Sequence, residues 1–244
     1  MGAWGASGGG SIPPTPTKSS AIIQLMLDRK KRYLQVALNS NPFEARSIIA
    51  SLPPSDRIIL EAGTPLIKEY GIQVVREIKS LWSTKSDNPY VVADLKCMDR
   101  GEREVGIAAQ AGASAAVVLG LAPVETINSF ISFCKGFGID SMVDMMNVDQ
   151  PFKILRKLTK LPDVVILHRG VDEEQFSQKP LPIHLINKVK GSSSVLIAMA
   201  GGDKPREIQS AVFNGADIVV VWKDFYESSS NASEIAANFL QNIK

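Results

Sequence analysis

Three charged side chains interrupt an apolar run in the segment VVADLKCMDRGE, which begins at Val91. Asp94, Lys96 and Asp99 fall within six positions of one another, where a buried core would exclude charge. Their opposite charges allow the ammonium group of Lys96 to stay ionised among carboxylates. We therefore expect these residues to belong to a functional site at the end of a strand.

Two more carboxylates, Glu61 and Asp144, lie towards the ends of the runs RIILEAG and DSMVDMM. If they share one cavity with Asp94, the acids repel one another unless a cation joins them. Salt bridges from Lys96 and Arg169 could supply that charge without a metal. A divalent metal is the other candidate, because ligands that are all oxygen suit Mg²⁺. Mg²⁺ could hold vicinal oxygens of a sugar and stabilise an enediolate as a Lewis acid.

One histidine lies where a proton-transfer group is expected. His168 ends the run DVVILHR, and an imidazole can move a proton near neutral pH. His184, the other of the two histidines in the chain, lies in LPIHLINKV. That segment predicts a helix away from the strand ends, so we expect His184 to be structural.

The segment AMAGGDKPREI predicts a phosphate site. It is typical of a strand, a turn at Gly201 and Gly202, and a helix with Asp203 as its cap and Pro205 in its first turn. Backbone N–H groups at such a helix start favour phosphate. Lys223, which follows the run DIVVVW, would add a positive charge for the same phosphate.

The elements that must position these residues alternate regularly from Tyr33 onward. Short apolar runs typical of strands alternate with amphipathic stretches typical of helices, which indicates βαβ units and a parallel sheet. The strand-like runs are YLQVAL, RIILEAG, YVVADLK, SAAVVLG, DSMVDMM, DVVILHR, SVLIAMAGG and DIVVVW. They predict an α/β fold, the (β/α)₈ TIM barrel, whose strands end at one face where catalytic groups gather. A doubly wound sheet is the alternative, although no Gly-x-Gly-x-x-Gly follows the first strand.

Composition sets the domain organisation and excludes some functions. Residues 1–20 are rich in Gly, Ser, Pro and Thr and predict a disordered tail, whereas residues 21–244 predict a single barrel domain that begins with a helix in SSAIIQLMLDRKK. A net charge of +2 without a basic run argues against nucleic-acid binding. No apolar run is long enough to span a membrane. Two cysteines without metal or redox spacing suit a reducing cytoplasm.

With these motifs in place, the chain resembles the 3-hexulose-6-phosphate synthases of the orotidine-monophosphate decarboxylase suprafamily. The segments that carry the resemblance are EAGTPLIKEYG, VVADLKCMDRGE and SMVDMMNV, supported by AGG and NGADIVVV. The resemblance implies an aldehyde-lyase. Such an enzyme joins ribulose 5-phosphate and formaldehyde reversibly into D-arabino-hex-3-ulose 6-phosphate through a metal-bound enediolate.

The resemblance also implies a role for individual residues. Glu61 and Asp94 would hold Mg²⁺, Asp144 would contact substrate hydroxyls, and His168 would shuttle protons at the reacting carbons. The implied assembly is a homodimer with shared active sites, in which Asp99 reaches into the neighbour's site. The other charged residues of the Asp-x-Lys motif would serve their own subunit.

Three positions depart from the family's pattern. Asn39 stands where the first strand usually ends in Asp, and it keeps the ability to bond a substrate hydroxyl. Arg169, directly after His168, is similar to the keto-gulonate-phosphate decarboxylase branch. Trp222 and Lys223 replace a Gly-Arg or Gly-Gly pair at the phosphate. Two alternatives therefore stay open: a 3-keto-gulonate-6-phosphate-type decarboxylase, or a divergent barrel that binds a ligand without catalysis.

Overall fold

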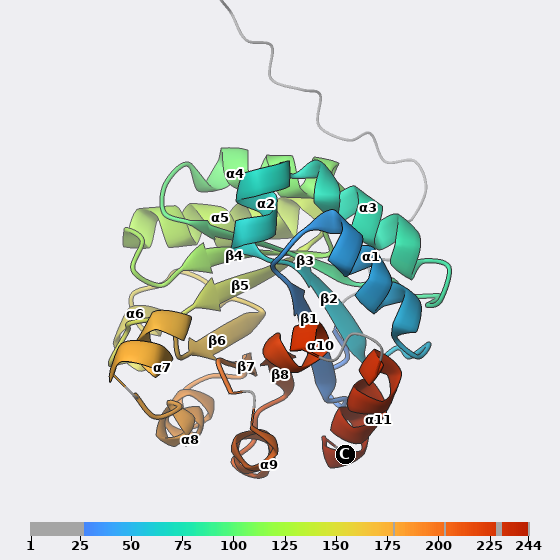
Figure 1. Ribbon diagram of the computed structural model, residues 1–244. Coiled ribbons are helices and arrows are strands. Elements are labelled where there is room, and N and C mark those ends of the chain that lie inside the picture. The colour runs from blue at the N-terminus through green and yellow to red at the C-terminus, as the bar shows by residue number, and fades with distance from the viewer. Residues whose placement is uncertain (1–26, 178, 203, 228–230, 244) are drawn as a thin grey trace, which may run out of the picture.

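The strands form a closed parallel barrel. A computed structural model describes residues 27–177, 179–202, 204–227 and 231–243. In this part of the chain, eight strands pair in sequential order, and β8 pairs back onto β1 (Figure 1). The strands are β1 Tyr33–Leu38, β2 Ile58–Ala62, β3 Val91–Cys97, β4 Ala115–Leu119, β5 Asp140–Asp144, β6 Val164–His168, β7 Leu196–Ala200 and β8 Ile218–Val221. The predicted TIM barrel and each predicted strand are confirmed, and the doubly wound alternative is excluded.

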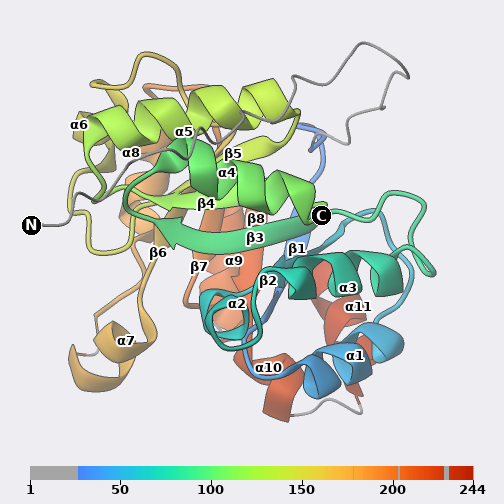
Figure 2. The ribbon, with the colours of Figure 1, turned by 90° about the horizontal axis from the view of Figure 1, so that it is seen from above.

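Helices cover the outside of this barrel, as the two views of the ribbon show (Figures 1 and 2). The amphipathic sequence of residues 65–82 falls on two helices, because the chain breaks at Gly71, whose φ is 82°. The helices are α1 Pro42–Ser51, α2 Thr64–Tyr70, α3 Gln73–Trp82, α4 Gly101–Gln110, α5 Val124–Phe137, α6 Pro151–Leu155, α7 Val171–Ser177, the 3₁₀ helix η1 Ile183–Leu185, α8 Ile186–Lys190, α9 Pro205–Phe213, α10 Lys223–Glu227 and α11 Ala232–Asn242.

The predicted tail and most of the predicted leading helix lie outside the described residues. Residues 27–31, the described end of that helix prediction, form coil and a turn before β1, so the prediction is wrong for this part. Asp203, the predicted cap of α9, also lies outside them; Lys204 holds the N-cap position, and among the described residues no side chain caps this helix. In the described part of the chain, no helix has the length and apolar character needed to cross a membrane.

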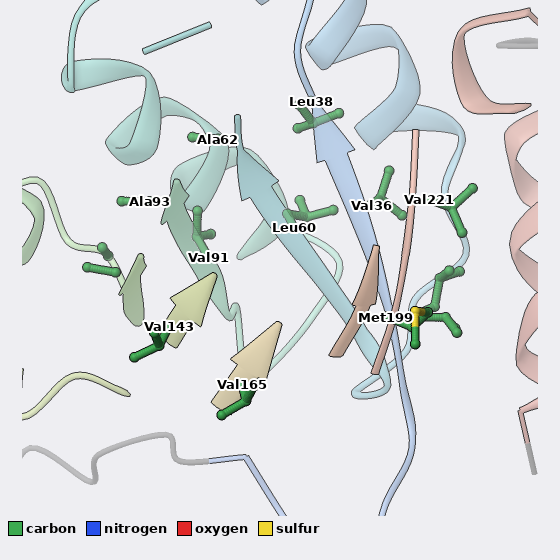
Figure 3. Packing of buried hydrophobic residues seen from close by; sticks show 14 of the residues in the cluster. Val36, Leu38, Leu60, Ala62, Val91, Ala93, Val143, Val165, Met199 and Val221 are labelled. Carbon is green, nitrogen blue, oxygen red and sulfur yellow. The ribbon is translucent and has the colours of Figure 1, made fainter. Parts of the chain in front are cut away.

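The strands separate two apolar clusters, because alternate residues of a strand face opposite sides. In β4, Val117 belongs to the cluster inside the barrel, whereas Val118 belongs to the cluster shared with the helices. Figure 3 shows part of that outer cluster, including Leu60 and Val165. The same alternation continues to the carboxyl ends of β2, β3, β5 and β6, where the inward positions are the polar residues Glu61, Asp94, Asp144 and His168. The apolar core thus orients the side chains that surround the barrel mouth.

The third strand becomes irregular where its charged residues begin. Its register against β4 shifts between Ala93 and Cys97, and Lys96 adopts a φ of 44°. Such an irregularity re-aims side chains and is common next to active sites. Positive φ at a residue other than glycine costs about 1–3 kcal/mol, so the surrounding structure must hold it. Asp94 and Lys96 both face the barrel mouth as a result.

Candidate active site

A cavity of about 270 Å³ opens at the carboxyl ends of the strands. Most of the residues predicted for the site line it: Asn39, Glu61, Asp94, Lys96, Asp144, His168, Arg169, Gly201 and Lys223. Asp99 is exposed on the loop after β3, outside this cavity, and Gly202 also lies outside its lining. The convergence of side chains from distant segments is the expected property of the catalytic face of a barrel.

Asp144, at the end of β5, connects Lys96 and His168. Its Oδ2 atom accepts hydrogen bonds from Lys96 Nζ at 2.9 Å and from His168 Nδ1 at 2.8 Å. Its Oδ1 atom accepts from the backbone N–H of Met146 at 2.9 Å. Lys96 Nζ also reaches Asp94 Oδ2 at 3.0 Å. Both oxygens of the buried Asp144 carboxylate are engaged, so this residue holds Lys96 and His168 in place.

These contacts set the charge of each group. Burial alone would raise the pKa of Asp144, but the charges of His168 and Lys96 lower it well below its usual value. Burial alone would lower the pKa of Lys96, but Asp94 and Asp144 raise it. The Asp144 carboxylate likewise outweighs burial and raises the pKa of His168. The cavity therefore holds an ammonium group and an imidazole that readily carries a proton, both facing one ionised carboxylate.

Glu61, at the end of β2, lies in the most unfavourable electrostatic environment of the cavity. Burial and the neighbouring Asp94 carboxylate raise the pKa of Glu61 to about 7. Gln35 donates a hydrogen bond from Nε2 to Glu61 Oε2, and Thr64 donates to Asp94 Oδ2 at 2.8 Å. The Oγ1 atom of Thr64 is also 2.7 Å from the backbone oxygen of Asp94.

Gln35 and Thr64 are functional-site residues that the sequence reasoning missed. Gln35 could have been found from the sequence, because it is a polar residue within the apolar strand YLQVAL. In the structure its side chain is buried, at 1% exposure. Thr64 had a weaker one, because it directly follows the Glu-Ala-Gly end of β2. Each supports one carboxylate of the cavity by a hydrogen bond.

The two carboxylates Glu61 and Asp94 fit a magnesium ion. Within the described residues, no group of three His, Cys, Asp or Glu side chains is arranged to hold a metal. Mg²⁺ is commonly held by one or two carboxylates together with waters and substrate oxygens, so a pair is sufficient. Burial and the Asp94 carboxylate raise the pKa of Glu61 even though Lys96 contacts Asp94, so further positive charge beside this pair would stabilise it. A divalent cation would supply it.

Asn39 lies at the edge of the cavity, beyond the last residue of β1. Its backbone N–H donates to the Tyr226 hydroxyl at 2.7 Å, which ties the end of β1 to α10. Its side-chain oxygen packs against Gly63, where a Cβ atom would come within 1.8 Å of it. Gly63 thus leaves room for the Asn39 amide at the cavity edge.

The predicted phosphate end of the cavity is formed by the segments after β6, β7 and β8. Arg169 Nη2 contacts Glu174 Oε1 at 2.9 Å and donates to the backbone oxygen of Gly201. Lys223 Nζ contacts Glu174 Oε2 at 3.0 Å. Trp222 faces the cavity, and its indole N–H is buried without a partner among the described residues. Arg169 and Lys223 therefore both contact the Glu174 carboxylate on α7.

Comparisons with known proteins show what this chain is similar to. A family model described as Orotidine 5′-phosphate decarboxylase / HUMPS family matches residues 32–237. The bifunctional enzyme Fae/Hps of Methanothrix thermoacetophila is 39% identical over 213 residues, which are 87% of this chain and 53% of that protein. The chain thus spans about half the length of the curated relatives it matches.

Solved structures match over most of their length. The 3-hexulose-6-phosphate synthase from Salmonella typhimurium superposes with a TM-score of 0.77 at 30% identity, covering 86% of this chain and 98% of that one. The 3-keto-L-gulonate-6-phosphate decarboxylase from Vibrio cholerae superposes with a TM-score of 0.68 at 21% identity, covering 87% and 97%. The second likeness shows the fold alone.

Proposed function

Because the chain belongs to the orotidine 5′-phosphate decarboxylase/HUMPS family, we propose that it is a Mg²⁺-dependent aldehyde-lyase of the 3-hexulose-6-phosphate synthase type. The reaction is the reversible aldol addition of ribulose 5-phosphate to formaldehyde, which forms D-arabino-hex-3-ulose 6-phosphate. The observation that carries the proposal is the Asp144 carboxylate shared by Lys96 and His168, beside the Glu61–Asp94 pair.

His168 is the group we assign to proton transfer. In the synthetic direction, a proton leaves C1 of ribulose 5-phosphate, and the resulting enediolate attacks the carbon of formaldehyde. A new C–C bond forms, and the formaldehyde oxygen takes up a proton to become a hydroxyl. The contact with Asp144 keeps the imidazole oriented in the cavity and favours its protonated form after it has accepted a proton.

Lys96 and the acidic pair would handle the negative charge that develops. The raised pKa of Lys96 keeps it an ammonium group, which can stabilise an anion but cannot act as an amine nucleophile towards formaldehyde. Glu61 and Asp94 would hold Mg²⁺, and Thr64 and Gln35 orient these two carboxylates. When bound, Mg²⁺ would supply Lewis-acid charge to the substrate oxygens.

Asp99 extends the proposal to the assembly. It is exposed on the loop after β3, next to Met98, which is 47% exposed, and it does not line the cavity of its own chain. Both facts suit a residue that completes the cavity of a second subunit, so we propose a homodimer with shared active sites. We place the reaction in the cytoplasm, in keeping with two cysteines that carry free thiols.

The test is consumption of formaldehyde by the purified protein. We expect consumption with ribulose 5-phosphate and Mg²⁺ together, and none when either is omitted or when Mg²⁺ is chelated. Asp94→Ala should lower the rate about a thousandfold or more, because several kcal/mol of transition-state stabilisation is lost. Asp56→Ala, an exposed acid paired with Lys31, is the matched control and should keep full activity. Full activity in Asp94→Ala would refute the mechanism.

The decarboxylase alternative rests on Arg169, and the structure offers that residue other partners. Its guanidinium group contacts Glu174 and Glu207, so its charge is compensated within the chain. Release of CO₂ from a 3-keto sugar-acid phosphate would favour the decarboxylase. Thermal stabilisation by sugar phosphates without any turnover would favour the ligand-binding alternative.

A further inference from the structure

Two cations that line the phosphate end of the cavity contact one carboxylate, and a third lies near it. Glu174, on α7, contacts Arg169 through Oε1 at 2.9 Å and Lys223 through Oε2 at 3.0 Å. Lys204, at the start of α9, lies close enough to contribute to the lowered pKa of Glu174, although burial alone would raise that pKa. The three cations come from the segments that follow β6, β7 and β8. Barrels commonly bind a substrate phosphate in the loops after the seventh and eighth strands.

We propose that Glu174 is an internal counter-anion, which the phosphate of the substrate displaces from Lys223. This inference rests on the proposed function to the extent that the substrate is a sugar phosphate. It makes Glu174 a specificity-determining residue, because only a ligand that brings its own strong negative charge can replace it.

The element that carries Glu174 can move without disturbing the core. Among the described residues of α7, none is buried, and the helix follows directly after Gly170. Its other anchor is also polar, since Glu173 accepts a hydrogen bond from the backbone N–H of Gly170 at 2.9 Å and pairs with Lys179. Figure 2 shows α7 extending away from the ring of strands. Breaking the Glu174 contacts therefore uncovers no side chain of α7 that belongs to the buried core.

Charge decides which ligands can make this exchange. A phosphate monoester carries about −1.5 to −2 charges at pH 7 and presents three acceptor oxygens, whereas a carboxylate carries one charge. It can therefore take over Lys223 with a stronger interaction than the one it breaks. Arg169 keeps Glu207, at 3.3 Å, when Glu174 leaves. A sugar without phosphate provides no anion for Lys223, so it cannot compensate for the lost ion pair.

The inference is tested by titrating inorganic phosphate into the protein and its variants by calorimetry. Glu174→Gln should bind phosphate about fivefold more tightly than the wild type, the effect expected from removing one partly exposed ion pair. Asp172→Asn is the matched control, because it removes the same charge from an exposed position of the same helix, outside the cavity lining. Its affinity for phosphate should equal that of the wild type.

Two further variants make the result specific to Lys223. Glu174→Asp keeps the charge and should show no gain in affinity. In the Lys223→Met background, Glu174→Gln should give no gain either, because the cation for which carboxylate and phosphate compete is absent. Weaker or unchanged phosphate binding in Glu174→Gln would overturn the inference, and so would absence of phosphate binding in every variant.

Steady-state kinetics separates this inference from the proposed function. Glu174→Gln should lower KM for the sugar phosphate about fivefold without raising kcat, because the interaction gained is the same in the bound substrate and in the transition state. Phosphate binding requires no turnover, so the calorimetric result stands even if no aldol reaction is found. An active enzyme in which Glu174→Gln leaves both KM and phosphate affinity unchanged would refute the role of Glu174 alone.

Discussion

At the scale of single residues, Asp144 determines the state of the candidate active site. One of its oxygens serves both Lys96 and His168, and the other is bound by a backbone N–H group. Removing one partner of a buried ion pair usually costs more than the pair contributes, because the remaining charge stays buried. The ionised form of Asp144 is therefore required to hold both Lys96 and His168 in place.

Asp144→Asn should change the protonation of His168 and the catalytic rate together. The asparagine amide loses the negative charge that raises the pKa of His168, so this pKa should fall. We expect kcat to decrease about a hundredfold or more, in line with the loss of a positioned acid–base group. Nuclear magnetic resonance can follow the titration directly, because the chain has two histidines.

His184 provides the internal control for that measurement. It lies on η1, outside the lining of the main cavity, so its ring resonances should be unchanged by Asp144→Asn. An unchanged pKa of His168 in the variant would show that the Asp144 contact does not control the imidazole.

At the scale of elements, the turns after the strands decide where the polar groups lie. Gly201, directly after β7, has a φ of 87°, and a Cβ atom there would lie 2.1 Å from the backbone oxygen of Arg169. The backbone after β7 therefore lies so close to the backbone after β6 that only a residue without a side chain fits between them. This approach brings Arg169 next to the phosphate end of the cavity.

Gly201→Ala should destabilise the protein by about 2–4 kcal/mol, because it combines an unfavourable φ with a clash against backbone. Gly136→Ala, in α5, is the matched control, because a Cβ atom there would meet nothing within 4 Å. The control should stabilise the protein by about 0.5–1 kcal/mol, the usual difference between glycine and alanine inside a helix. Equilibrium unfolding in urea measures both, and equal stabilities of the two variants would refute this reading of the turn.

At the scale of the whole molecule, the end of the barrel opposite the cavity is closed by the chain segments that flank it. Leu27 packs against the inner apolar cluster. Arg57 donates to the backbone oxygens of Arg32, Leu240 and Ile243, which ties the entry to β1 and the end of α11 to the start of β2. These bonds also satisfy carbonyl groups that the end of a helix leaves unpaired.

The same end contains a buried acid that should make the free energy of unfolding depend on pH. Asp140 accepts a hydrogen bond from the Tyr90 hydroxyl, but burial outweighs it and raises the pKa of Asp140 to about 6. The folded protein therefore holds this proton more tightly than the unfolded chain does. The stability that Asp140 contributes is present below about pH 4 and is lost as the pH rises through about 6.

Asp140→Asn should remove this dependence. Between pH 4 and pH 7.5, the free energy of unfolding of the wild type should fall by about 2–3 kcal/mol relative to the variant, which corresponds to a shift of about two pKa units. Asp87→Asn, on an exposed loop, is the matched control and should follow the wild type. Parallel curves for the wild type and Asp140→Asn would contradict the assigned charge state of Asp140.

The sequence by itself determined the barrel fold and which polar residues lie at the carboxyl ends of its strands. Strand-like runs and amphipathic stretches alternate along the chain, and this alternation leaves few folds other than a barrel. Successive residues of a strand face opposite sides. The apolar neighbours of Glu61, Asp144 and His168 pack outward against the helices, so these three residues face inward. These are local properties, so they can be read from adjacent residues.

The tertiary structure alone decided which of these groups contact one another. The shared contact of Asp144 with Lys96 and His168 joins three strands, and it depends on barrel register and on the irregularity in β3. Lys223 meets Glu174 across 49 positions of sequence. Neither pairing has a local signal, because the interaction between two charges depends on their separation and burial in the folded chain.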